Sequence, residues 1–203
     1  MNSALKRKTD AELLARYSAG DETAFRMIVT RYKDGLYAFL SRFLNNRREL
    51  IEDVFQETFL QLFHSQDSFD TSRPLRPWLF TIAANKAKDV LRKRQRKGAM
   101  PIGTLAEPEE MSFEDVLNTI ISDDTTPYDH LQSEETAGQV RKIIFDLPEH
   151  LKEILILAYF NKFSYKQIAE ILSIPIGTVK SRLHTAVGRF AKEWRALGGS
   201  KEI

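Results

Sequence analysis

The stretch SYKQIAEILSIPIGTVKSRLHTAVGRFAK, residues 164–192, decides the fold of this chain. Its segment 165–172 carries apolar residues at helical spacing, which predicts a short amphipathic helix. Residues 173–175 interrupt that helix, because Pro175 lacks the amide hydrogen that a continuing helix needs. A second helix is predicted to start at Pro175 or Ile176, and a proline suits a first helical turn.

The second helix has one apolar face, and its polar residues lie elsewhere on its surface. Ala169 of the first helix is small at the point where two crossing helices must approach closely. The pair is therefore predicted to be a helix-turn-helix, which places its second helix in the major groove of DNA. The alternative is a helical hairpin whose basic face is simply solvated, because the same spacing also suits two packed helices that bind no DNA. The apolar face consists of Val179, Leu183, Val187 and Phe190.

Length and composition bound the class of protein. The chain has 203 residues, 42% of them hydrophobic, which suits two small domains or one ordinary domain. It has no cysteine, which excludes disulfides and thiolate metal sites. The N-terminus is basic but no apolar segment follows it, and no run approaches the roughly 20 apolar residues of a membrane-spanning helix. We expect a soluble, cytoplasmic protein with no membrane insertion.

Charge is distributed unevenly along the chain. The net charge is only +2, yet residues 98–139 hold ten acidic residues and no Lys or Arg, which leaves +12 for the remainder. Two basic blocks joined by an acidic connector suit a protein that binds nucleic acid.

Helical patterns dominate the sequence, and strand patterns are almost absent. The predicted fold is all-α: a helix bundle over 9–97, a flexible acidic linker over 98–129, and a helix-turn-helix domain over 130–197. One transient helix is expected inside the linker, at 113–121. The helices predicted outside the helix-turn-helix run from Thr9 to Gly20, Asp21 to Phe43, Arg48 to Phe63 and Trp78 to Lys97, with a loop at 68–77, then from His130 to Leu147 and Glu149 to Phe160.

Four segments carry a resemblance to a known family. They are DVFQETFLQLF at 53–63, RPWLFTIAANKAKDVLRKRQR at 76–96, LPEHLKEILILAYF at 147–160 and SYKQIAEILSIPIGTVKSRLHTA at 164–186. In this order, with this linker, the chain resembles the extracytoplasmic-function sigma factors of bacterial RNA polymerase, a group of the sigma-70 family. The resemblance implies a protein without catalysis or cofactor of its own. It would bind core polymerase, recognise the −10 and −35 promoter elements and help to open the duplex.

The first segment resembles the surface that docks on the clamp coiled coil of core polymerase. Acids at three- and four-residue steps on one side of a helix can pair with basic residues of a partner helix. Phe55 and Phe59 would hold the bundle. The alternative is an ordinary solvated helix face. The residues assigned to polymerase binding are Asp53, Gln56, Glu57 and Gln61.

The second segment resembles the part that captures and melts the −10 element. Trp78 offers a stacking surface beside cations, and stacking is worth about 1–3 kcal/mol per base. In the family, unstacked bases of the non-template strand enter a pocket between the helix and the preceding loop, here Asp70 to Pro77. Trp78 is equally well explained as a core aromatic, and Phe80, Ile82, Ala83 and Val90 are expected in the core. The residues assigned to this site are Arg73, Arg76, Trp78, Asn85, Lys86, Asp89, Arg92 and Lys93.

The last two segments resemble the domain that reads the −35 element as duplex. The resemblance places Lys180, Ser181, His184 and Thr185 at base edges, with Lys166, Arg182 and Arg189 at phosphates and Thr178 on the same surface. Many relatives carry arginine or an aromatic residue in place of His184 and Thr185, which leaves base preference open, and His184 can also be a plain surface histidine. Ser173 replaces the glycine common at the turn, which implies some strain.

Further partners follow from the resemblance alone. Family members contact the flap as well as the clamp of core polymerase, and many are held inactive by an anti-sigma factor. The acidic linker would run through the polymerase near the RNA exit path, where its charge would mimic nucleic acid. A flexible tether whose acids merely confer solubility is the alternative.

Two other classes of protein stay open from the residues. An enzyme is disfavoured because the four histidines are scattered, and the chain has no phosphate-binding glycine loop and no nucleophile motif. A helix-turn-helix repressor or activator that acts without core polymerase is the second, although the basic residues at 86–97 are hard to explain there.

Overall fold

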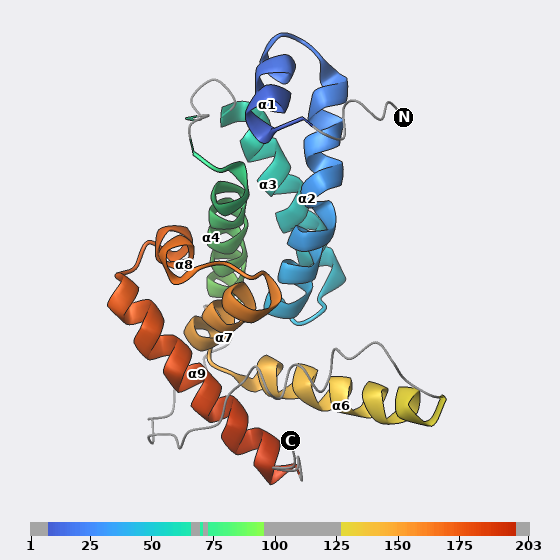
Figure 1. The fold of residues 1–203 in the computed structure, drawn as a ribbon, viewed down its shortest axis with the longest axis vertical. Coiled ribbons are helices and arrows are strands. Elements are labelled where there is room, and N and C mark those ends of the chain that lie inside the picture. Colours follow the sequence, from blue (N-terminus) through green and yellow to red (C-terminus); the bar gives the residue numbers. More distant parts are fainter. Residues whose placement is uncertain (1–7, 66–69, 71–72, 96–126, 198–203) are drawn as a thin grey trace. The chain divides into compact units, whose positions relative to one another are not determined.

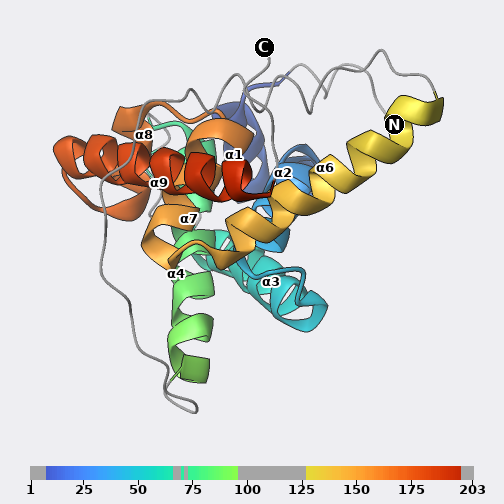
Figure 2. The same ribbon diagram turned by 90° about the horizontal axis from the view of Figure 1, so that it is seen from below.

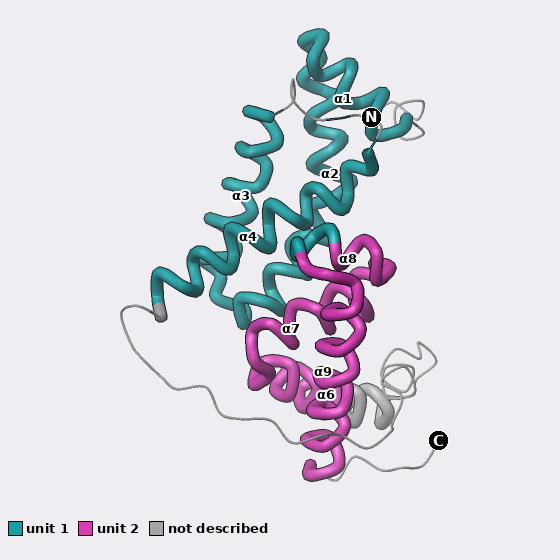
Figure 3. Tube along the Cα trace, turned by 90° about the vertical axis from the view of Figure 1, so that its left-hand side faces the viewer, with its two compact units in different colours: residues 1–100, 170–173 teal, residues 101–169, 174–203 magenta. Residues whose placement is uncertain are grey.

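The computed structural model describes residues 8–65, 70, 73–95 and 127–197. Most of the predicted linker, with its transient helix at 113–121, lies outside the described residues. The chain divides into two compact units, residues 1–100 with 170–173 and residues 101–169 with 174–203 (Figure 3). The regular structure of the described residues is helical throughout (Figure 1), which confirms the predicted all-α class.

The first unit is a bundle centred on one long helix. It contains α1 (Asp10–Ser18), α2 (Glu22–Phe43), α3 (Arg48–Ser65) and α4 (Leu75–Gln95). Helix α2 packs against the other three, and α3 packs along α4. Leu36, Phe39 and Leu79 are completely buried between them. Burial of each such side chain stabilises the fold by about 1.5–3 kcal/mol.

Local signals set the ends of these helices. Thr9 and Glu12 form a capping box at the predicted start of α1: the Glu12 N–H donates to Thr9 Oγ1 at 3.2 Å and the Thr9 N–H donates to Glu12 Oε2 at 2.6 Å. Gly20, at φ 92°, follows the end of α1 as predicted. Helix α4 begins at Leu75, three residues before the expected Trp78. Pro77 therefore lies inside the first turn, where its missing N–H leaves no helical hydrogen bond unmade.

The second unit is organised around its last helix. It contains α6 (Pro127–Asp146), α7 (Glu149–Leu155), a π-helical turn (Ile156–Phe160), the start of α8 (Tyr165–Leu172), whose residues 170–172 are grouped with the first unit, and α9 (Ile176–Ala196). Both α6 and α7 pack against α9, as Figure 2 shows. The helix predicted to reach Phe160 stops its α-helical bonding at Leu155. The next turn is a wider π-helical turn, in which the Asn161 N–H donates to the carbonyl oxygen five residues earlier, Ile156 O, at 3.1 Å.

The turn between α8 and α9 is a Schellman motif. The Ile174 N–H donates to Ala169 O at 3.0 Å and the Ser173 N–H donates to Glu170 O at 3.3 Å, with Ser173 at φ 54°. Helix α9 then starts at Ile176, and Pro175 stands at its N-cap, immediately before the first turn. The predicted inner face of α9 is confirmed by the burial of Val179, Leu183 and Phe190, with Val187 half-buried.

Candidate functional site

The four residues assigned to polymerase binding all lie on the surface of α3. Asp53, Gln56, Glu57 and Gln61 are exposed. Leu60, half exposed at 50%, lies one helical turn from Gln56, and Phe63 is also exposed on α3. Sequence reasoning did not assign Leu60 to this surface, although a large apolar side chain among polar and acidic residues on one helix face indicates a protein contact. The Phe63 ring also packs against the rings of Tyr17 and Phe25. The α3 surface therefore offers apolar and acidic groups together.

The structure separates these four residues into two groups. Glu57 accepts a hydrogen bond from Lys86 Nζ of α4 at 3.0 Å. Gln61 donates to Ser65 Oγ at 3.0 Å and lines a hollow between α3 and α4. Asp53 and Gln56 lie on the part of the surface away from that hollow. The residues assigned to polymerase and to DNA thus meet along the line where α3 and α4 pack.

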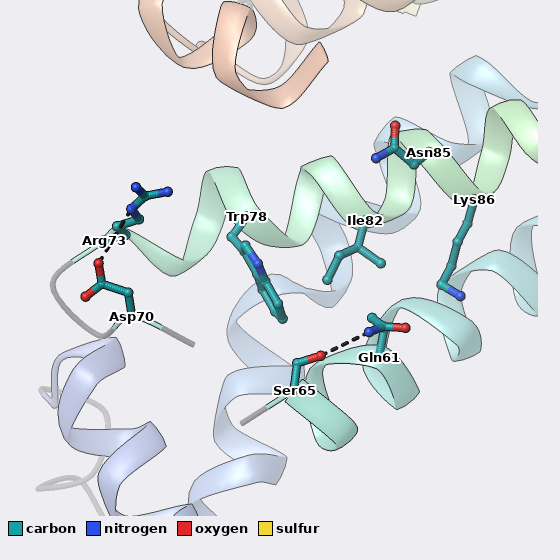
Figure 4. Close-up of a pocket in the computed structure, with 8 residues that line it drawn as sticks. All are labelled: Gln61, Ser65, Asp70, Arg73, Trp78, Ile82, Asn85 and Lys86. Carbon is teal, nitrogen blue, oxygen red and sulfur yellow. Dashed lines mark hydrogen bonds and ion pairs between the residues drawn. The ribbon is translucent and has the colours of Figure 1, made fainter. Parts of the chain in front are cut away.

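That hollow has a volume of about 520 Å³, and the assigned cations Arg73 and Lys86 line it. Figure 4 shows Trp78, Ile82 and Lys86 pointing from α4 toward α3, with Arg73 and Asp70 at the end where α4 begins. Trp78 is half-buried, so it belongs to the wall of the hollow and not to the central core. The complete lining consists of Gln61, Ser65, Asp70, Arg73, Trp78, Ile82, Asn85 and Lys86.

The core residues expected on α4 fall into two groups, buried and half-buried. Phe80 and Ala83 are buried, as predicted. Ile82 and Val90 are only half-buried, because Ile82 faces the hollow and Val90 lies on the half of α4 near its exposed basic end. Ser65, the last residue of α3, also lines the hollow. The sequence did not indicate this, because a single serine at a helix end belongs to no motif.

The cations on α4 and just before it differ in burial and in their contacts. Arg76 is half-buried with its guanidinium carbon 5.6 Å from the centre of the Phe80 ring, and burial lowers the pKa of Arg76. Arg73 lies 3.6 Å from Asp70, and Arg92 lies 3.7 Å from Asp89, both as exposed pairs. Lys93 and Asn85 are exposed. Exposed pairs of this kind are weak and leave their cations available to phosphates.

On the second unit, the assigned −35 residues occupy the outer surface of the helix-turn-helix. Lys166 of α8 and Lys180, Ser181 and His184 of α9 are exposed, while Thr178, Arg182, Thr185 and Arg189 are half-buried. The hydroxyls of Ser181 and Thr185 donate to their own helix, to Thr178 O at 3.2 Å and to Ser181 O at 3.0 Å. In this arrangement both hydroxyls can still accept a hydrogen bond, but must rotate to donate one.

One basic residue near this surface escaped the sequence analysis. His150 stands in the first turn of α7, the helix that packs against α9. Burial, together with the charges of Arg182 and Arg189, lowers the pKa of His150 from its usual value of 6.5. The charges of Arg182 and Arg189 therefore disfavour protonation of His150, and a bound phosphate would offset that effect. Sequence could not reveal this, because 32 and more residues separate His150 from its neighbours on α9.

No helix in the described part of the chain is both long and apolar enough to cross a bilayer. The described residues also contain no group of three His, Cys, Asp or Glu arranged to hold a metal ion.

Comparisons with family models and with individual proteins point to the same family. Residues 28–97 match the model of sigma-70 region 2, and residues 137–189 match that of sigma-70 region 4. The chain is 34% identical over 178 residues to the extracytoplasmic-function RNA polymerase sigma factor SigW of Bacillus subtilis, covering 88% of this chain and 92% of that protein. It is 33% identical over 182 residues to the sigma-E factor of Haemophilus influenzae, covering 88% and 91%.

Solved structures share the fold. CnrH, in complex with the cytosolic domain of CnrY, superimposes with a TM-score of 0.64 at 22% identity, covering 93% of this chain and 99% of that one. The sigma factor RpoE of Bartonella quintana, in complex with the anti-sigma factor NepR, gives 0.62 at 24% identity, covering 84% and 96%. Matches to both sigma-70 regions, in order along one chain, favour a sigma factor over an independent repressor. The chain belongs to the extracytoplasmic-function group of RNA polymerase sigma factors.

Proposed function

We propose that this sigma factor divides promoter recognition among three surfaces. The exposed face of α3 binds core polymerase, the hollow between α3 and α4 receives the opened −10 strand, and α9 reads the −35 duplex. The observation that carries the proposal is the hollow itself, because it combines a partly exposed tryptophan with cations beside the polar face of α3. Residues 9–97 would form the first functional domain and residues 130–197 the second, joined by the acidic linker. The chain itself contributes no catalytic step, and it works in the cytoplasm, where polymerase and promoter meet.

The polymerase surface is tested by reversing one charge on α3. Asp53 makes no ion pair with any residue that the structure describes, so its carboxylate is available to a basic partner. Asp53→Arg should weaken binding to core polymerase at least tenfold in a fluorescence titration, because like charges would meet on the docking face. Asp34→Arg, the same charge change at an exposed site on α2, is the matched control. Equal affinities for both variants would contradict this placement.

Trp78 itself can report on the strand-binding hollow. The chain has two tryptophans, and Trp194→Phe leaves Trp78 as the one that remains. Bases that stack against an indole quench its fluorescence, and stacking contributes about 1–3 kcal/mol per base. Adding a single-stranded −10 oligonucleotide to the reconstituted holoenzyme should therefore quench the emission of the Trp194→Phe protein more than that of a control that also carries Trp78→Phe, which accounts for the tryptophans of the polymerase. Tight binding with unchanged emission would mean that the bases enter elsewhere.

The duplex-reading surface is tested on α9 with two lysines. Lys180→Ala removes an exposed donor from the assigned face, whereas Lys192→Ala removes an exposed donor outside the assigned set. A lost base or phosphate contact costs about 1–3 kcal/mol. Initiation from a promoter with an intact −35 element should fall about tenfold or more for Lys180→Ala and stay unchanged for Lys192→Ala. Equal activity of the two variants would remove α9 from this role.

An inhibitory protein partner is the remaining part of the proposal. The two solved relatives of similar fold are each bound to another protein, CnrY in one case and the anti-sigma factor NepR in the other. We expect this chain to be held inactive in the same general way. Affinity capture from its own cells, followed by release of the bound protein with excess core polymerase, would test this.

A further inference from the structure

One ion pair joins the predicted polymerase surface to the predicted strand-binding hollow. Lys86 Nζ of α4 lies 3.0 Å from Glu57 Oε2 of α3, although the two residues are 29 positions apart. The Lys86 side chain is 27% exposed and the Glu57 side chain 59% exposed. The stem of Lys86 is therefore largely covered, while the carboxylate of Glu57 stays open to solvent and to a partner.

The pair differs from its neighbours in what it connects. Arg48 and Glu52 pair within α3, and Arg92 and Asp89 pair within α4, so neither of these ion pairs connects two helices. Glu57 and Lys86 connect α3 to α4 at the wall of the hollow, where Lys86 is itself a lining residue (Figure 4). Glu57 therefore pairs with Lys86 where it would otherwise bind the polymerase, and Lys86 pairs with Glu57 where it would otherwise bind DNA.

We propose that the Glu57–Lys86 ion pair is an intramolecular latch that makes polymerase docking and strand binding favour each other, an inference that rests on the proposed function. In the free chain, Glu57 occupies the ammonium group that a DNA phosphate would need. A basic group of the polymerase that takes the Glu57 carboxylate releases Lys86 toward the hollow. A phosphate that takes Lys86 releases Glu57 toward the polymerase in return, because such coupling between two ligands is reciprocal.

The size of the effect follows from the exposure of the pair. Ion pairs between exposed side chains are weak, and their measured strengths correspond to about a 1.5- to 5-fold change in an equilibrium constant. A contact of this strength can be exchanged readily for a polymerase or phosphate contact. It would also weaken as ionic strength rises, since exposed charges are screened by salt.

A double-mutant cycle on the full-length free chain tests the strand side of the latch. The probe is a fluorescent single-stranded oligonucleotide, and binding is measured by anisotropy at low salt. Glu57→Gln should tighten binding about 1.5- to 5-fold. In a Lys86→Met background, the same substitution should lose most of that gain. Glu52→Gln, which removes an equal charge from α3 without touching Lys86, controls for the general loss of negative charge.

The reciprocal side is tested with core polymerase. Lys86→Met should tighten polymerase binding by a similar factor, because it leaves Glu57 open to the polymerase, whereas Lys33→Met on α2 should change nothing. The latch is overturned if Glu57→Gln binds the strand no better than Glu52→Gln, or if its gain persists undiminished beside Lys86→Met. It is likewise overturned if Lys86→Met leaves polymerase affinity unchanged. A wild-type chain that binds neither polymerase nor strand would overturn the proposed function as well, which separates the two failures.

Discussion

Replacing Ser173 with glycine should stabilise this protein. Ser173 occupies the C′ position of the Schellman motif that ends α8, with φ 54°. Side chains with a Cβ are disfavoured there because the Cβ approaches the following carbonyl oxygen, at a cost of roughly 1–2 kcal/mol. The Ser173 side chain is exposed, so its removal leaves no cavity.

Two opposing effects set the magnitude of this change. Relief of the left-handed conformation favours glycine by the roughly 1–2 kcal/mol given above. The greater freedom of glycine in the unfolded chain opposes it by about 0.5–1 kcal/mol. The net expectation is a gain of about 0.5–1 kcal/mol in the free energy of unfolding.

Urea unfolding followed by circular dichroism measures that difference. Ser173→Ala is the matched control, because it removes the same hydroxyl but keeps a Cβ at φ 54° and should bring no comparable gain. A glycine variant that is less stable than the wild type would refute the assignment of strain to this turn. Equal gains for glycine and alanine would refute it too, since the hydroxyl would then be responsible.

Three further changes test other parts of the fold. Phe190→Ala empties a completely buried site on α9 and should cost about 3–5 kcal/mol of unfolding free energy, measured in urea; a cost below about 1 kcal/mol would contradict the observed packing. Thr9→Ala removes the N-cap of α1 and should cost about 1 kcal/mol, with an unchanged melting curve as the contrary result. The pKa of His150 is lowered in the folded chain, so the unfolded chain binds that proton more readily. The stability this confers is present above pH 6.5 and is lost as the pH falls through the folded value. His150→Gln should therefore show a smaller fall in melting temperature between about pH 7.5 and about pH 5.5, and an equal fall in both proteins would exclude the effect.

Local sequence signals predicted most of the helices and several of their ends. The capping residues Thr9 and Glu12 and the glycine at position 20 mark their helix ends because each acts through neighbours a few positions away. The inner face of α9 follows from a period of 3.6 residues. The early start of α4 was missed because Pro77 was read as a helix breaker, although a proline in a first turn leaves no hydrogen bond unmade.

The arrangement of the candidate site was less accessible to sequence. Helical spacing placed Asp53, Gln56, Glu57 and Gln61 on one side of α3 but could not show which edge of that side faces α4. Tertiary packing decides that Glu57 meets Lys86 and that Gln61 lines the hollow. The wide turn after Leu155 has no signal in the apolar spacing either, since the same residues would suit an uninterrupted α-helix.

Initiation by reconstituted holoenzyme is the most direct measurement of the proposed division of labour. Purified chain and core polymerase are combined on promoter templates, and run-off transcripts are compared with duplex binding by the chain alone. We predict initiation at promoters only when the chain and core polymerase are both present, with weak binding of duplex by the chain alone. Tight, sequence-selective binding of duplex by the free chain, together with no increase in initiation by the polymerase, would contradict it.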